Sequence, residues 1–251
     1  MRHFLVSIVC LLSISDLFAQ AEPLLLNKET IAGIDLERRK PSWAPPDREL
    51  YSTRIFSGED IGVNVTASSP GTQPWEDLPV DEFVIVLSGK SVLTEAGASK
   101  EFLKGDFFMV PRGFTGSWTT VGGPNYFLEI AVFSKRRAEA ATSQTSVHHI
   151  PTEKLSGIGS SLNEETMLQG AELTASINRC SNPTREIDDL ATDQFIYVLN
   201  GMVTISFAAG KETTFYTHDA YVLPKGFSGT LQFEGIGSYQ ELVVTSVLNE
   251  D

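Results

Sequence analysis

The chain of 251 residues carries a formal net charge of −13 at pH 7, with 32 acidic against 19 basic residues, and 41% of its residues are hydrophobic. Such an acidic balance lacks the positive surface that nucleic acids and anionic membranes attract, so it excludes both as partners. The length allows two folded units of about 100 residues each, which is a normal domain size.

The first residues have the pattern of an export signal. Arg2 supplies the positive start, an apolar run covers residues 4–18, and Ala19 and Ala21 form a small-residue cleavage site. Serines and an aspartate interrupt the apolar run, which is also too short for a comfortable membrane span. We therefore predict that residues 1–21 are a signal peptide, that there is no stable membrane insertion, and that the mature protein is exported to the periplasm or the extracellular space.

The mature chain keeps one cysteine. Cys10 lies inside the predicted signal, so Cys180 is left without an intramolecular disulfide partner. Ordinary hydrophobic cores must therefore stabilise the fold in an oxidising compartment, where many small domains rely on disulfides.

The apolar segments of the first half are short, rich in Val, Ile, Phe and Tyr, and separated by Gly, Pro, Asn or Ser. Segments repeated at intervals of roughly 8 to 12 residues are typical of an all-β fold. The predicted strands are Ile61–Ala67, Phe83–Leu87, Ser91–Thr94, Phe107–Val110, Gly116–Thr120 and Tyr126–Phe133.

One of these strands is apolar on both faces. Phe83, Ile85 and Leu87 fall on one face, while Val84 and Val86 fall on the other. This pattern predicts a strand between the lumen of a barrel and a partner outside it, and the obvious partner is the second half of the chain.

A pattern in the first half returns in the second. Residues 81–89 return as 193–201, and residues 111–117 return as 224–230. The offset changes from 112 residues (89 to 201) to 113 residues (111 to 224), so the connection between the two blocks gained one residue. The chain is therefore predicted to be a tandem duplication of one domain.

The repeats define the domain organisation. We predict an N-terminal domain over residues 22–134, a linker over 135–149 and a C-terminal domain over 150–251. Two short helical candidates, Lys135–Ala141 and Thr152–Leu155, lie in the connection.

Two motifs resemble those of the cupin superfamily. The first cupin motif ends with a Glu that is followed, after six residues, by a Gly, and Glu82 to Gly89 match this pattern. The second motif consists of a Gly, five residues, a Pro, any residue and a Gly, and Gly105 to Gly113 match it. The match covers both halves, so the resemblance implies a bicupin, an all-β chain with two tandem cupin barrels of the double-stranded β-helix or RmlC-like jelly-roll type. Residues 105–118 are similar to a subset that includes ureidoglycine aminohydrolase-like proteins and ethanolamine-utilisation cupins.

The resemblance also tells where metal ligands are expected. Metal-dependent cupins place two histidines four and six residues before the motif Glu, and a third histidine three residues beyond the last Gly of the second motif. With the Glu itself, these positions hold Glu76, Leu78, Glu82 and Gly116 in the first half and Asp188, Leu190, Gln194 and Gly229 in the second. Because no imidazole remains, we predict no metal and no cofactor; carboxylates holding magnesium or calcium with water remain an alternative.

The candidate ligand-binding residues are placed around the opening of the first barrel. The resemblance implies that Glu82 faces the lumen, and Glu76 shares its strand parity. Carboxylates, aromatic faces and an arginine suit a small polar molecule such as a sugar, ureide or amine. The predicted ligand-binding residues are Trp75, Glu76, Glu82, Arg112, Trp118 and Tyr126.

Three interpretations of the function remain open. The first is an exported bicupin that binds a small polar molecule in the N-terminal barrel. The second is an enzyme resembling ureidoglycine aminohydrolase, or another cupin enzyme, because the resemblance implies the same bicupin layout and some relatives share the export signal. Crowded carboxylates would raise one pKa toward the range of acid–base catalysis, although no catalytic residue is assigned. The third is a structural protein that forms oligomers such as a homodimer. Because Leu231 replaces Trp118 and Gln194 replaces Glu82, the second barrel is expected to be the more structural half.

Overall fold

The structure is a computed structural model that describes residues 21–39, 48–122, 126–136, 146–151, 155, 164–180, 183–235 and 239–247. The predicted signal peptide lies outside these residues except for its last position. Both helical candidates of the connection lie largely outside them as well. Among the described residues, no helix is long and apolar enough to cross a membrane.

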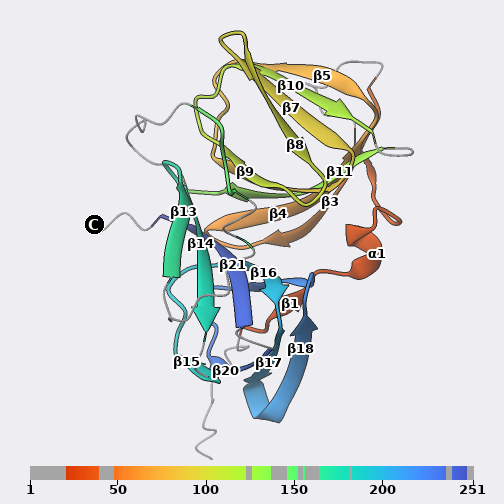
Figure 1. Cartoon of the computed structure of the whole chain (residues 1–251). Coiled ribbons are helices and arrows are strands. Elements are labelled where there is room, and N and C mark those ends of the chain that lie inside the picture. Colours follow the sequence, from red (N-terminus) through yellow and green to blue (C-terminus); the bar gives the residue numbers. More distant parts are fainter. Residues whose placement is uncertain are drawn as a thin grey trace, which may run out of the picture.

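The N-terminal half forms a jelly-roll barrel from two sheets (Figure 1). The larger sheet has the order β12-β9-β6-β11-β4-β3-β2, with β12 at His148–His149, β9 at Phe107–Val110, β6 at Glu82–Ser88, β11 at Phe127–Ser134, β4 at Ile61–Ser68, β3 at Leu50–Ser57 and β2 at Arg38–Arg39. The smaller sheet has the order β5-β10-β7-β8, with β5 at Gly71–Trp75, β10 at Gly116–Val121, β7 at Lys90–Glu95 and β8 at Ala98–Leu103.

The C-terminal half repeats this arrangement. Its larger sheet has the order β1-β19-β16-β21-β14-β13, with β1 at Leu24–Leu25, β19 at Ala220–Leu223, β16 at Gln194–Asn200, β21 at Tyr239–Ser246, β14 at Leu173–Cys180 and β13 at Glu164–Gln169. Its smaller sheet has the order β15-β20-β17-β18, with β15 at Thr184–Ile187, β20 at Gly229–Glu234, β17 at Met202–Phe207 and β18 at Lys211–Tyr216. The predicted tandem jelly-roll fold is confirmed.

Helical structure in the described part is limited to short segments. The helix α1, Lys28–Ile31, begins after Asn27, whose side-chain oxygen accepts a hydrogen bond from the backbone N–H of Glu29 at 2.7 Å. A 3₁₀ turn at Ala208–Gly210 connects β17 to β18.

The equivalent hairpins turn at glycines. Gly89 and Gly201 have φ angles of 79° and 86°, a region in which other residues are strained. At Gly201 a Cβ atom would also come within 2.5 Å of the carbonyl oxygen of Glu234. Glycine is therefore required at this turn.

Each of the two larger sheets takes an edge strand from outside its own predicted domain. β1, at the start of the chain, pairs with β19 of the C-terminal barrel, where Leu24 lies opposite Val222. β12, in the predicted linker, pairs with β9 of the N-terminal barrel, where His148 lies opposite Met109. The larger sheet of each half therefore includes a strand that lies outside the residues predicted for that domain.

The two larger sheets face each other and bury a shared core between the barrels (Figure 1). Phe83 and Ile85 of β6 belong to this core together with Phe195 and Leu242 of the C-terminal barrel, whereas Val84 belongs to the core of the N-terminal lumen. The prediction that β6 lies between a lumen and the other repeat is therefore confirmed.

Candidate functional site

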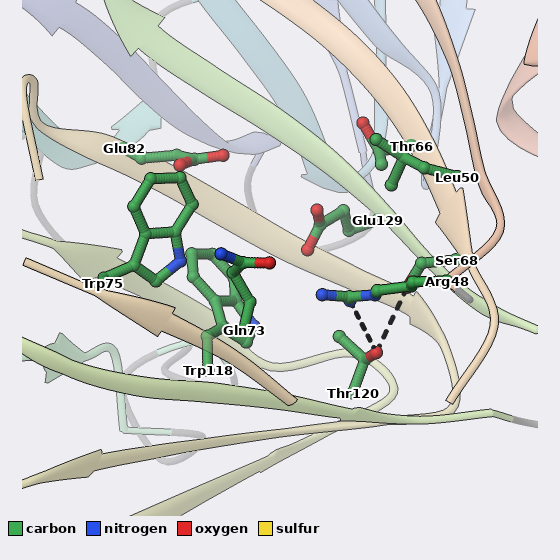
Figure 2. Close-up of a pocket in the computed structure, with 10 residues that line it drawn as sticks. All are labelled: Arg48, Leu50, Thr66, Ser68, Gln73, Trp75, Glu82, Trp118, Thr120 and Glu129. Atoms are coloured by element: carbon green, nitrogen blue, oxygen red, sulfur yellow. Dashed lines mark hydrogen bonds between the residues drawn. The ribbon is translucent and has the colours of Figure 1, made fainter. Parts of the chain in front are cut away.

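A cavity of about 110 Å³ lies in the lumen of the N-terminal barrel (Figure 2). Strands from both sheets form its wall, and one residue comes from the segment before β3. Its lining residues are Arg48, Leu50, Thr66, Ser68, Gln73, Trp75, Glu82, Trp118, Thr120 and Glu129. An engineered cavity of about 150 Å³ holds benzene, so this cavity fits a molecule of a few non-hydrogen atoms.

Strand alternation directs two glutamates into the cavity. On β11, Phe127 belongs to the lumen core and Ile130 to the core between the barrels, so Glu129 lies on the lumen side with Phe127. On β6, Glu82 shares the lumen side with Val84. Both carboxylates therefore point into the barrel.

Burial controls the protonation of both carboxyl groups. Glu129 is 8% exposed, and its Oε2 atom has no hydrogen-bond partner within the described part of the chain. Burial raises the pKa of Glu129 well above its ordinary value; the Glu82 carboxylate raises it further, while Arg48 opposes the change. Burial also raises the pKa of Glu82 to about 7. Glu82 is thus poised to hold or release a proton near neutral pH, and Glu129 keeps its proton more readily than an exposed glutamate does.

Arg48 places a positive charge at the end of the cavity that lies away from Glu82 (Figure 2). Its Nη2 atom donates hydrogen bonds to Ser68 Oγ at 3.1 Å and to Thr120 Oγ1 at 2.9 Å. Burial lowers the pKa of Arg48, and the negative charge of Glu129 counteracts this effect. Its buried Nε atom has no hydrogen-bond partner among the residues described.

A second donor faces the same cavity from the smaller sheet. Trp118 is 7% exposed, its ring contacts Phe108 edge-on with 5.9 Å between centroids, and its buried Nε1 lacks a hydrogen-bond partner among the described residues. Buried polar atoms are nearly always hydrogen-bonded, so three partnerless atoms around one cavity, on Arg48, Trp118 and Glu129, indicate a site for a polar molecule or water.

The structure brings three of the six predicted ligand-binding residues together. Trp75, Glu82 and Trp118 line the cavity (Figure 2). Glu76 does not, because β5 ends at Trp75 and Glu76 is exposed in the turn that follows. The strand parity assumed for Glu76 and Glu82 is broken by this turn.

The other two predicted residues also lie away from the cavity. Arg112 forms an ion pair with the buried carboxylate of Glu172 of the C-terminal barrel at 3.2 Å. Tyr126 is 37% exposed, and its hydroxyl group donates a hydrogen bond to Glu49 Oε2 at 3.1 Å. Arg112 thus belongs to the contact between the barrels, and Tyr126 to the surface.

Two charged residues of the site, Arg48 and Glu129, were not among the predicted ligand-binding residues. Glu129 is the only charged residue in an otherwise apolar strand, and this pattern is a signal that could have revealed it. Arg48 precedes its strand, and no spacing in the sequence connects it to the cavity.

The duplication provides an internal comparison for Glu129. Glu129 pairs with Thr66 of β4, and Glu241 pairs with Asn178 of the equivalent strand β14. Glu241 therefore occupies the place of Glu129 in the C-terminal barrel.

Glu241 is fully buried, and both of its carboxylate oxygens accept hydrogen bonds. The four donors are Asn178 Nδ2 at 3.3 Å, Arg185 Nη2 at 3.1 Å, Tyr221 hydroxyl at 3.4 Å and Tyr239 hydroxyl at 2.8 Å. The protein itself satisfies this carboxylate.

The N-terminal barrel has a different residue at each of the four donor positions. By strand register, Thr66 stands for Asn178, Gln73 for Arg185, Phe108 for Tyr221 and Phe127 for Tyr239. The two phenylalanines lack the hydroxyl groups, and Gln73 is uncharged and shorter than arginine. The N-terminal lumen thus has an equivalent buried carboxylate, but its Oε2 atom has no partner among the described residues, whereas Glu241 accepts four hydrogen bonds.

The lumen does not match the metal centre that metal-dependent cupins carry. Its charged lining residues are two glutamates and an arginine, and none of the described histidines lines the cavity. In the described ranges, no three side chains of His, Cys, Asp or Glu come together to hold a metal ion. These side chains therefore do not fit the metal centre of a metal-dependent cupin.

Comparisons with known proteins agree with this fold. The family model of the EutQ-like cupin domain matches residues 63–122 and again residues 182–235. No curated protein matches the chain in sequence.

Solved structures resemble the chain over most of its length. The protein Ylba from E. coli has a TM-score of 0.61 at 11% identity, covering 92% of this chain and 93% of its own. A cupin 2 conserved barrel domain protein from Leptotrichia buccalis has a TM-score of 0.57 at 14% identity, covering 79% and 89%. A mutant of salicylate 1,2-dioxygenase from Pseudoaminobacter salicylatoxidans has a TM-score of 0.59 at 13% identity, covering 90% and 84%.

Identities this low establish the fold alone. The two segments that match the family model and the two barrels define the class of protein, which is a double-barrelled, all-β cupin. The chain belongs to the cupin superfamily.

Proposed function

We propose that this bicupin binds a small polar molecule in the lumen of its N-terminal barrel, and that residues 1–21 direct its export. The observation that carries the first part is the contrast between Glu129 and Glu241. One barrel fills the space around its buried carboxylate with its own donors, and the other leaves a cavity there. A ligand that supplies the missing hydrogen bonds removes the cost of leaving Glu129 unpaired.

The size and lining of the cavity limit the ligand. About 110 Å³ is below the range of roughly 300 to 1,000 Å³ that holds drug-sized molecules. The indole of Trp75 and the charged groups of Arg48, Glu82 and Glu129 favour a compact molecule with several hydrogen-bonding atoms. Simple amines, ureides and fragments of sugars meet these conditions.

The test is a thermal-shift screen of small amines, ureides and sugars on the mature protein, followed by calorimetric titration of any hit. A ligand selective for the folded state raises its stability. We expect Glu129→Gln to weaken binding at least about tenfold, which corresponds to the loss of roughly one charge-assisted hydrogen bond. Glu76→Gln is the matched control, because Glu76 lies outside the cavity and its change leaves binding intact. If no compound of any class binds, the structural interpretation replaces this proposal.

A second candidate function is catalysis at the same site. The observation that favours it is the pKa of Glu82, which burial raises to about 7, the range in which a general acid or base works best at neutral pH. Following each bound compound by NMR for conversion decides between binding and turnover. A catalyst loses conversion in Glu82→Gln, whereas a pure binding protein converts nothing in either form.

A further inference from the structure

The charges of the two lumens differ. In the C-terminal barrel the carboxylate of Glu241 pairs with the guanidinium group of Arg185, and the position equivalent to Glu82 holds the neutral Gln194. One positive and one negative charge balance there. The guanidinium group also lies over the ring of Phe233, with 5.4 Å from its central carbon to the ring centroid.

The N-terminal lumen holds one cation and two carboxylates. Figure 2 shows Glu82, Glu129, the indole of Trp75 and the guanidinium group of Arg48 arranged around the same space. The remaining lining residues are uncharged, and Gln73 stands where the other barrel has Arg185. With both glutamates ionised, the cavity therefore lacks one positive charge.

Resting on the proposed function, we propose that the ligand of this cavity is a small organic monocation of the guanidinium or amidinium class. The C-terminal barrel shows how such a group binds this carboxylate, because the guanidinium group of Arg185 donates to Glu241 at 3.1 Å. A free ligand of the same chemistry does for Glu129 what Arg185 does for Glu241. A forked planar cation matches a carboxylate geometrically, and a point charge such as ammonium does not.

Two further features support a cation over a neutral ureide of the same shape. The carboxylate of Glu82 supplies the additional negative charge, and it has no counterpart in the C-terminal lumen. The indole rings of Trp75 and Trp118 also line the cavity, and indole is the aromatic group that attracts cations most strongly.

The affinity for a cation is expected to depend on pH, because the carboxyl groups of the site titrate. The titratable groups that line the cavity are Glu82, Glu129 and Arg48. Burial raises the pKa values of both glutamates, so at low pH they are protonated and neutral. A cation binds the ionised forms, and its affinity therefore increases as pH rises through the raised pKa of each glutamate, which for Glu82 is about 7. A neutral ligand has no comparable dependence.

The experiment compares methylguanidinium with methylurea, which have nearly the same shape and differ in charge. Each is titrated at millimolar concentrations into the mature protein by calorimetry or NMR, at pH 8 and at pH 5.5. We expect methylguanidinium to bind at least about tenfold more tightly than methylurea at pH 8. The preference falls at least about tenfold at pH 5.5, and also in Glu82→Gln, which gives this position the neutral side chain found in the other barrel.

The outcomes separate this inference from the proposed function. Equal or tighter binding of methylurea, or binding of neutral compounds alone from the screen, overturns the cation class and leaves a binding protein. A preference for methylguanidinium that persists unchanged in Glu82→Gln and at pH 5.5 overturns the assigned role of Glu82. Failure of every compound overturns both proposals. Glu76→Gln serves again as the control that keeps the preference, and the pH comparison needs no variant to fold.

Discussion

The carboxyl group of Glu82 destabilises the folded protein at neutral pH. Its pKa is about 7 in the folded state, because burial disfavours the charged form, while glutamate in an unfolded chain titrates near 4.3. Between these values the unfolded chain loses a proton that the folded chain keeps, so the free energy of unfolding falls as pH rises. Above about pH 7 the loss is complete and constant.

We therefore expect Glu82→Gln to raise the free energy of unfolding by about 3 to 4 kcal/mol at pH 8 and to leave it nearly unchanged at pH 4. Urea denaturation of the mature protein at the two pH values measures the difference. If Glu82→Gln raises the free energy of unfolding at pH 4 as much as at pH 8, the prediction is wrong, because titration of Glu82 then plays no part.

At the scale of residues, the sequence could place the predicted site residues that lie within strands, which are Trp75, Glu82 and Trp118. Glu82 and Trp118 face the lumen because their positions in β6 and β10 determine their direction. Arg112 is in a turn, and its direction is set by Glu172, a residue 60 positions away whose proximity only the fold creates. No local pattern contains that information.

At the scale of elements, two equivalent aspartates join the barrels. Asp81, which precedes β6, accepts hydrogen bonds on Oδ2 from the backbone N–H groups of Glu172 at 2.6 Å and Leu173 at 3.0 Å. Asp193, which precedes β16, accepts on Oδ2 from the N–H groups of Asp60 at 2.8 Å and Ile61 at 3.4 Å. The barrels are thus connected by the same contact in both directions.

The backbone around these contacts leaves no free space. A Cβ atom on Gly170 would come within 2.1 Å of Asp81 Oδ2, and one on Gly58 would come within 2.0 Å of Asp193 Oδ2. Each aspartate is therefore accommodated beside a glycine of the opposite barrel.

We expect Asp81→Asn to lower the free energy of unfolding by about 2–3 kcal/mol. Asparagine keeps the shape but replaces one acceptor oxygen by a donor that faces N–H groups. Asp193→Asn is expected to have a similar effect, since its contacts are equivalent. Chemical denaturation followed by intrinsic tryptophan fluorescence measures both.

Asp77→Asn is the matched control for these two variants. Asp77 is exposed with a φ angle of 57°, a conformation that asparagine tolerates, so its replacement changes the stability by at most about 0.5 kcal/mol. If Asp81→Asn is as mild as this control, the aspartate contacts do not stabilise the pairing of the barrels.

The regular strands could be predicted from the sequence, and the exchanged ones could not. The predicted strands Ile61–Ala67 and Phe83–Leu87 correspond to β4, Ile61–Ser68, and β6, Glu82–Ser88. β1 and β12 have two residues each, which is too short for a period of two to appear. Their pairing depends on where the edges of the distant sheets lie.

At the scale of the whole molecule, the duplication behaves as a dimer within one chain. The core between the barrels takes its buried residues from both halves, including Val63 and Ile130 from one and Ile177 and Val244 from the other. The sequence predicted this pairing through the two apolar faces of β6. Such a core is typical of a permanent interface, whose apolar area neither partner can expose to water.

Neither half of the chain is complete by itself, because the two halves share a core and each larger sheet has an edge strand from outside its own domain. A chain ending after residue 142 lacks β12 and exposes the apolar face of β4, β6 and β11; a chain starting at residue 143 lacks β1 and exposes the face of β14, β16 and β21. We expect neither half to be a soluble monomer when expressed alone from residue 22 or 143. The N-terminal half then aggregates or pairs with a second copy of itself.

Co-expression of the two halves tests the same idea in the opposite direction. Together they restore both exchanged strands and the shared core, so we expect them to co-purify in equal amounts and to unfold in one thermal transition, as we also expect of the intact chain. Size-exclusion chromatography and calorimetry measure both properties. A monomeric N-terminal half with its own cooperative transition contradicts the prediction, because a barrel that is stable alone does not need its partner to cover β4, β6 and β11.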